Sequence, residues 1–116
     1  MAGTNRNNKS KQSPQTKIIK VGANEYGKLP PQAVELEDSV LGAIMLAKEA
    51  FASVADLLRP EVFYKDQNRL VYEAIRTLST KDKPIDILSV SEQLKNNGTL
   101  EQVGGTVYLS ELTRRV

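Results

Sequence analysis

Cysteine, histidine and tryptophan are all missing from this 116-residue sequence. Without cysteine, neither a disulfide framework nor a thiolate metal site can form. Without histidine, a Ser-His-Asp triad, a histidine general base and the usual zinc ligand sets are excluded. No run of about 18 apolar residues occurs, and the polar N-terminus lacks the apolar core of a signal peptide. We therefore expect a soluble cytoplasmic protein that makes no contact with a membrane.

Signals for binding phosphate are missing as well. The sequence has no GxxxxGK[ST] loop, and the pair Gly104-Gly105 alone indicates a turn rather than a nucleotide site. Three neighbouring carboxylates, Glu35, Glu37 and Asp38, suit metal binding or acid–base chemistry. Such a cluster also stabilises the first turns of a helix through the helix dipole, and we expect that role here. The sequence therefore predicts no catalytic residue, no metal site and no cofactor in this chain.

Charge is divided unevenly along the chain. Residues 1–32 carry a net charge of +5, and residues 33–116 carry a net charge of −3. The first 28 residues hold too few apolar side chains to offset the entropy lost on ordering. We expect residues 1–28 to form a disordered basic tail, which serves either solubility or non-specific nucleic-acid contact. The acidic remainder opposes a DNA-reading helix in the folded part, where DNA contact should be weak or absent.

From Pro30 onward the hydrophobic periodicity is helical. Apolar residues recur at spacings of three and four within 33–46, 50–58, 67–78, 85–98 and 107–116, with short turns beginning at Pro60 and Thr99. Only the segment GTVYL resembles a strand, and a single strand has no partner. The prediction is an all-α fold, a compact bundle of about six short helices over residues 29–116. The expected core residues are Leu36, Val40, Ile44, Phe51, Leu57, Phe63, Leu70, Val71, Ile75, Leu78 and Leu94.

Capping and stop signals predict where these helices begin and end. Asp66 is the expected N-cap of the 67–78 helix. For the next helix, either Asp86 caps directly or Ser89 begins a capping box. Gly98 predicts a left-handed stop, and Thr106 is the expected cap of the last helix.

Gly42 lies on the predicted apolar face of the first helix, where glycine costs roughly 0.5–1 kcal/mol relative to alanine. A glycine without Cβ lets another helix backbone approach closely. We expect the neighbour to be the helix that carries Leu70 to Leu78, because it has the strongest apolar stripe. A leucine at this position should overpack the contact and destabilise the fold by about 1–3 kcal/mol.

Three blocks of the sequence resemble the N-terminal domain of DnaB-type replicative DNA helicases. The first is LPPQAVELEDSVLGAIML, with its proline pair, spaced acids and Val-Leu-Gly step. The second is RPEVFYKDQNRLVYEAIRTL, and the third is PIDILSVSEQLKNNGTLEQVGGTVYLSEL, with its Gly-Gly-x-x-Tyr-Leu turn. The blocks occur in order and cover residues 29–113. One departure is Asn68, where the family often has histidine.

The resemblance implies a role in bacterial DNA replication. In that family the domain forms a collar tier on a hexameric ring, helps to organise the subunits as a trimer of dimers, and docks primase in the primosome. A helicase loader acts on the same protein. ATP and Mg²⁺ belong to a helicase domain that follows a helical hairpin, and this chain is expected to stop before both. We accordingly expect a cytoplasmic, nucleoid-associated interaction module that is a monomer or a weak dimer by itself.

Glu35 and Tyr108 are the candidate residues of the partner surface, because both match positions in the resembling blocks where a partner could bind. Glu35 alternatively serves only the helix dipole, and Tyr108 alternatively lies in the core with a hydrogen-bonded hydroxyl. The competing function is a nucleic-acid-binding helical domain that uses the basic tail. A third reading is an adaptor bundle unrelated to replication.

Overall fold

A computed structural model describes residues 31–47 and 49–116 of the chain. The predicted tail, residues 1–28, lies outside these residues. Over the described part the fold is helical and contains no strand, which confirms the predicted all-α class. The elements are α1 (Pro31–Leu46), α2 (Ala50–Val54), the 3-10 helix η3 (Pro60–Val62), α3 (Asp66–Thr80), α4 (Ile87–Asn96), α5 (Leu100–Val103) and α6 (Gly105–Thr113). The contacts described below all lie within Val34–Val116.

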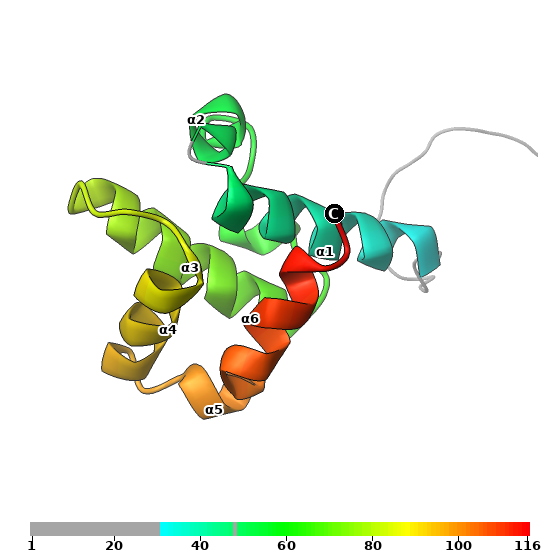
Figure 1. The fold of residues 1–116 in the computed structure, drawn as a ribbon. Coiled ribbons are helices and arrows are strands. Elements are labelled where there is room, and N and C mark those ends of the chain that lie inside the picture. Colours follow the sequence, from blue (N-terminus) through cyan, green and yellow to red (C-terminus); the bar gives the residue numbers. More distant parts are fainter. Residues whose placement is uncertain (1–30, 48) are drawn as a thin grey trace, which may run out of the picture. The chain divides into compact units, whose positions relative to one another are not determined.

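Helix α3 is the element around which the others pack. It contacts η3, α4 and α5, while α6 packs on α4 and α5 and ends against α1 (Figure 1). Its apolar stripe predicts this position, because the stripe buries Val71, Tyr72, Ala74, Ile75 and Leu78 along almost the whole helix. None of the described helices is long and apolar enough to cross a bilayer.

Most of the expected core residues lie inside the fold. Ile44, Phe63, Val71, Ile75, Leu78 and Leu94 are buried, and Val40, Phe51 and Leu70 pack against them half-buried. Eight further residues complete the buried cluster and were not among the expected core residues listed above: Leu41, Met45, Tyr72, Ala74, Val90, Val103, Leu109 and Leu112.

Two of the expected core residues are exposed, so these predictions were wrong. Leu36 is 65% exposed and Leu57 is 76% exposed. Leu36 precedes the buried Asp38 by two positions, which places it about 200° away around α1, on the opposite side. Leu57 lies beyond the end of α2 at Val54, so helical periodicity no longer decides which way its side chain points.

An aromatic cluster joins α2 and η3 to α3. The Tyr72 ring lies 5.0 Å from the Phe63 ring and 6.0 Å from the Phe51 ring, centroid to centroid. Both pairs are tilted, an arrangement that aromatic quadrupoles favour. The Tyr72 hydroxyl donates to the Leu58 carbonyl oxygen at 2.8 Å, so this buried phenol has a partner. The cluster thus explains how two short helical turns hold their places beside a long helix.

The helix ends follow the sequence signals in part. The Asp86 carboxylate accepts from the Ser89 backbone N–H at 2.8 Å, so Asp86 is the cap of α4. Gly98 has the expected left-handed φ of 76°. The predicted caps Asp66 and Thr106 are wrong, because Lys65 and Gly104 occupy the N-cap positions of α3 and α6 and neither makes a side-chain cap bond.

Gly42 does permit a close approach, but the predicted neighbour was wrong. A Cβ built on Gly42 would collide with the Leu112 carbonyl oxygen and would lie 2.7 Å from the Leu112 carbonyl carbon and 2.8 Å from Val116 Cγ2. The end of α6 and the residues after it therefore take the place that we assigned to the helix from Leu70 to Leu78. The strength of an apolar stripe does not reveal which neighbour needs backbone contact.

The fold predicts one stabilising substitution. Ser91 on α4 is 7% exposed, and its hydroxyl has no hydrogen-bond partner. A buried hydroxyl without a partner costs about 1–3 kcal/mol, so Ser91→Ala should raise the free energy of unfolding by about 1 kcal/mol or more. Ser79→Ala, on the exposed face of α3, is the matched control and should gain about 0.5 kcal/mol at most from helix propensity. Urea unfolding measures the free energy of unfolding of both variants, and equal increases would show that the buried Ser91 hydroxyl does not destabilise the fold.

Candidate functional site

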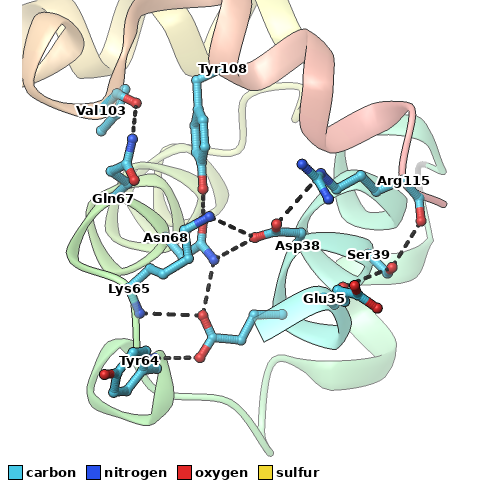
Figure 2. Close-up of polar contacts among 11 residues, drawn as sticks. Glu35, Asp38, Ser39, Tyr64, Lys65, Gln67, Asn68, Val103, Tyr108 and Arg115 are labelled. Atoms are coloured by element: carbon cyan, nitrogen blue, oxygen red, sulfur yellow. Dashed lines mark hydrogen bonds and ion pairs between the residues drawn. The ribbon is translucent and has the colours of Figure 1, made fainter. Parts of the chain in front are cut away.

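Helices α1, α3 and α6 meet through a group of polar side chains, which we call the polar network. Figure 2 shows these side chains converging from the three helices and from the turns beside them. The network consists of Glu37, Asp38, Lys65, Asn68, Tyr108 and Arg115. It contains Asp38, the only charged residue that is buried in the described part of the chain, and we therefore take it as the candidate functional site.

Asn68 lies at the centre of the polar network and is completely buried. Its amide nitrogen Nδ2 donates to Asp38 Oδ1 at 2.9 Å and to Glu37 Oε1 at 3.0 Å. Its Oδ1 accepts from the Tyr108 hydroxyl at 2.5 Å. A primary amide has two donor hydrogens and one acceptor oxygen, so the side chain of Asn68 has a partner on every side. One residue of α3 thereby links α1 to α6.

Asp38 is a carboxylate with only 3% of its surface exposed. Besides the bond from Asn68, it accepts from Lys65 Nζ at 3.4 Å and pairs with Arg115 Nε at 3.6 Å. A buried charge is tolerated only when opposite charges and hydrogen bonds replace the lost water. The three partners come from α3, from the turn before it and from the end of the chain. The position of this one carboxylate therefore depends on three separate segments.

Glu37 supplies the N-terminal cap that α3 does not obtain from its own residues. Its carboxylate accepts from the backbone N–H of Tyr64 and, at 3.4 Å, from the backbone N–H of Lys65. These donors lie just before the first turn of α3, where the helix dipole favours negative charge. The cap bonds therefore come from another helix, and they tie α1 to the start of α3.

Tyr108 contributes both its ring and its hydroxyl. The Lys65 ammonium lies 5.1 Å from the centre of the ring, within the range of a cation–π contact. Burial raises the pKa of the Tyr108 hydroxyl, and the neighbouring Lys65 opposes this effect only partly. Burial lowers the pKa of Lys65, but the interactions with Tyr108 and the charge of Asp38 outweigh it and raise the pKa overall. At neutral pH the phenol is thus a donor and the amine a cation.

The two predicted partner-surface residues, Glu35 and Tyr108, lie in different environments. Tyr108 is half-buried and belongs to the polar network, as the alternative reading of a hydrogen-bonded core tyrosine anticipated. Glu35 is exposed, and only its backbone carbonyl makes a described contact, accepting from Ser39 Oγ at 3.0 Å. No described contact joins Glu35 to Tyr108, and their joint role at a partner surface stays a prediction.

Sequence reasoning missed Asp38 and Asn68 as buried residues. We interpreted the acidic cluster as dipole compensation, although Asp38 precedes the buried Leu41 and Met45 by three and seven positions. Asn68 likewise precedes Val71 and Tyr72 by three and four positions on the buried stripe of α3. A helical wheel that includes polar residues places both on the inward faces. It does not show that they pair with each other.

The chemistry of the polar network is structural. All of its charged side chains have partners within it, and its only hydroxyl donates to an amide. Within residues 31–47 and 49–116, no group of three acidic, histidine or cysteine residues is arranged to hold a metal ion. The arrangement can fix the relative positions of α1, α3 and α6, and it presents no free nucleophile or base to a substrate.

Comparison with known proteins identifies relatives of this domain. Residues 29–116 match the family described as DnaB-like helicase N terminal domain. The chain is 47% identical over 92 residues to the replicative DNA helicase DnaB of Rhodothermus marinus, which is 79% of this chain and 10% of that protein. It is 37% identical over 89 residues to the replicative DNA helicase DnaC of Bacillus subtilis, which is 77% of this chain and 20% of that protein. The chain thus spans a small part of the length of these relatives.

A solved structure has the same fold. The crystal structure of the N-terminal domain of DnaB helicase from Mycobacterium tuberculosis superposes with a TM-score of 0.72 at 40% sequence identity. The similarity covers 76% of this chain and 61% of the other. The likeness in both sequence and fold agrees with the three blocks that sequence analysis singled out.

The polar network predicts that Asn68 is a main determinant of stability. Asn68→Ala removes one bond from each of Asp38, Glu37 and Tyr108 and leaves buried polar groups without a partner. We expect the free energy of unfolding to fall by about 3 kcal/mol. The adjacent Gln67→Ala is the control, because it removes a single half-buried bond to the Val103 carbonyl and should cost about 1 kcal/mol. Urea denaturation of both variants at neutral pH measures the difference, and similar losses would contradict the central place of Asn68.

The raised pKa values of Lys65 and Tyr108 predict a loss of stability in alkali. A group whose pKa is raised by folding contributes its full stabilisation below its unfolded pKa, and that contribution is lost as the pH rises through the folded pKa. The free energy of unfolding should therefore fall above about pH 10. Tyr108→Phe removes the tyrosine share, so its stability should fall less between about pH 9 and pH 12 than that of the unmodified chain.

Tyr64→Phe is the control for this pH series, because Tyr64 is exposed and gives only its backbone N–H to the polar network. Urea midpoints across the series should show the unmodified slope for Tyr64→Phe. An equal change of slope in both variants would show that burial of the Tyr108 hydroxyl is not the cause.

Proposed function

The chain belongs to the family of DnaB-like helicase N-terminal domains, and from that membership we propose that it is a non-catalytic protein-interaction module of a hexameric replicative DNA helicase. The module contributes to the collar of the ring and provides a docking surface for primase and for a helicase loader. ATP hydrolysis, with its Mg²⁺, and DNA unwinding belong to other parts of such a helicase. DNA contact by the module itself is weak or absent, because its described part is acidic.

The observation that carries this proposal is the number of large apolar side chains that the fold leaves in water. Eight of them are more than half exposed, although the same domain buries a continuous core: Leu36, Leu46, Leu57, Val62, Tyr64, Leu88, Val107 and Val116. Single exposed apolar residues are ordinary, but interfaces are built from apolar anchors with a polar rim. A small domain that pairs its buried charges internally and leaves apolar side chains outside is suited to binding other proteins.

Two of these exposed residues adjoin the predicted partner residues. Leu36, which is 65% exposed, follows Glu35 on α1, and Val107, which is 70% exposed, precedes Tyr108 on α6. Each pair places an exposed apolar side chain beside a polar or aromatic one, and protein interfaces combine an apolar core with a polar rim. The exposure of Leu36, which we had expected in the core, thus supports a role of this part of α1 as a contact surface. Tyr108 would present its ring, since its hydroxyl is held by Asn68.

A titration with a primase C-terminal domain tests the docking surface. Glu35→Ala and Leu36→Ala should each weaken binding about tenfold, which corresponds to about 1.4 kcal/mol. Glu92→Ala is the matched control, because Glu92 is exposed on α4 and makes no described side-chain contact. Isothermal titration calorimetry gives the dissociation constants.

Tyr108 requires a separate comparison because of its structural bond. Tyr108→Phe keeps the ring and loses only the hydroxyl, whereas Tyr108→Ala loses both. If primase contacts the Tyr108 ring, Tyr108→Ala should weaken binding, while Tyr108→Phe should bind nearly as tightly as the unmodified chain. Unchanged affinity for Glu35→Ala, Leu36→Ala and Tyr108→Ala would remove the proposed docking surface. Sedimentation of the 12.8 kDa chain with and without primase shows whether it also associates with itself.

A further inference from the structure

The ring of Tyr108 is held by contacts at its tip, on its face and at the start of its side chain. Its hydroxyl donates to Asn68 Oδ1 at 2.5 Å, and the Lys65 ammonium lies 5.1 Å from the ring centre. The Gly104 backbone lies against the start of the side chain, because a Cβ built on Gly104 would be 3.2 Å from Tyr108 Cβ. Figure 2 shows the ring extending from α6 towards Asn68 on α3. These neighbours restrict the two side-chain torsions that place the ring.

Lys65 is itself fixed at both of its ends. Its backbone N–H donates to Glu37 Oε1 at 3.4 Å, and its ammonium lies 3.4 Å from Asp38 Oδ1. An ammonium has three donor hydrogens, so it can bind Asp38 and still lie near the ring. A free lysine side chain loses much conformational entropy when it becomes ordered. The contacts with Glu37 and Asp38 restrict Lys65 independently of Tyr108.

The hydroxyl contact and the cation contact are separable by substitution. Tyr108→Phe removes the hydrogen bond to Asn68 and keeps an aromatic ring that the Lys65 ammonium attracts. In that variant Lys65 provides the remaining polar contact of the ring among the described contacts. Lys65 therefore gives a physical reason why the phenylalanine ring should keep the orientation of the tyrosine ring.

We propose that Lys65 is a positioning residue of the docking surface, which holds the Tyr108 ring in one orientation before a partner binds. The inference rests on the proposed function, in which primase contacts this ring. A side chain that is already ordered loses less conformational entropy when the complex forms. Lys65 acts through Tyr108 and does not itself contact primase.

The orientation of the ring can be measured in the absence of primase. Three-bond NMR couplings between Hα and the two Hβ atoms of residue 108 report its χ1 rotamers. We expect one rotamer in the unmodified chain and in Tyr108→Phe, but averaged couplings when Tyr108→Phe is combined with Lys65→Met, which lacks the charge. Lys65→Arg in the same background should restore one rotamer, because it keeps a cation. A single rotamer in the combination with Lys65→Met would overturn the proposal.

Arg115→Met is the matched control for the couplings. Arg115 is the other cation beside Asp38, at 3.6 Å from Oδ2, and it makes no described contact with the Tyr108 ring. In the Tyr108→Phe background it removes one positive partner of Asp38, as Lys65→Met does, and should leave the couplings unchanged. Equal averaging in both variants would show a general loosening of the polar network and would contradict a specific role of Lys65.

Calorimetric titration with a primase C-terminal domain tests whether the orientation matters for docking. In the Tyr108→Phe background, Lys65→Met should raise the dissociation constant about fivefold, and Lys65→Arg should restore it. In the Tyr108→Ala background, Lys65→Met should have no further effect, because there is no ring left to position. Lys95→Met is the control for binding, since Lys95 is exposed on α4, makes no described side-chain contact and should not alter the affinity.

The same titrations separate this inference from the proposed function. If Tyr108→Ala weakens binding and Lys65→Met has an equal effect with and without the ring, the positioning role is wrong and the docking surface stands. The same conclusion holds if Lys65→Met averages the couplings of residue 108 without changing the affinity. If Tyr108→Ala binds as tightly as the unmodified chain, the ring is not a docking contact, and the inference fails together with that part of the proposed function.

Discussion

The buried carboxylate of Asp38 is the constraint on which the rest of the structure depends. A charge that is 3% exposed must be compensated within the protein, and its partners Lys65, Asn68 and Arg115 are contributed by separate segments. Meeting this requirement positions α1 against α3 and holds the end of the chain on α1. Apolar burial provides most of the stabilisation, but it is not directional. The polar network adds direction, because hydrogen bonds to one carboxylate and one amide are formed only when the three helices have this arrangement.

At two positions, contacts between helices outweigh the local preferences for helix caps and for residues within a helix. Lys65 occupies the N-cap position of α3, a residue that cannot accept a hydrogen bond there, and Asp66 follows it without capping. The start of α3 is stabilised instead by the Glu37 carboxylate of α1. Gly42 is a second case, because a residue unfavourable within a helix allows the end of α6 to approach α1. Both departures from local preference occur where α1 meets another element, and they mark the contacts that the fold needs most.

The sequence therefore predicted the elements well and their contacts poorly. The periodic stripe of α3 and the Asp86 cap of α4 are properties of neighbouring residues, so they can be read from the chain directly. The burial of Asp38 is different, since it requires a partner, Asn68, that lies 30 positions further along the chain. Periodicity assigns a side chain to a face of its helix but does not identify what faces it. Leu36 and Leu57 are exposed for different local reasons, one on the outer side of α1 and one beyond the end of α2, but an apolar residue is buried only if another element covers it.

The difference between the partnered and the exposed acidic residues of α1 also bears on function. Two of the three acidic residues that suited a catalytic or metal cluster, Glu37 and Asp38, have partners within the domain. They are thus withdrawn from chemistry with a substrate, while Glu35, only two positions away, remains exposed. Within one helical turn the same residue type has a structural role on one side and is available to a partner on the other. The described part of the domain therefore offers other molecules its outer faces, which is the property that the proposed assembly module requires.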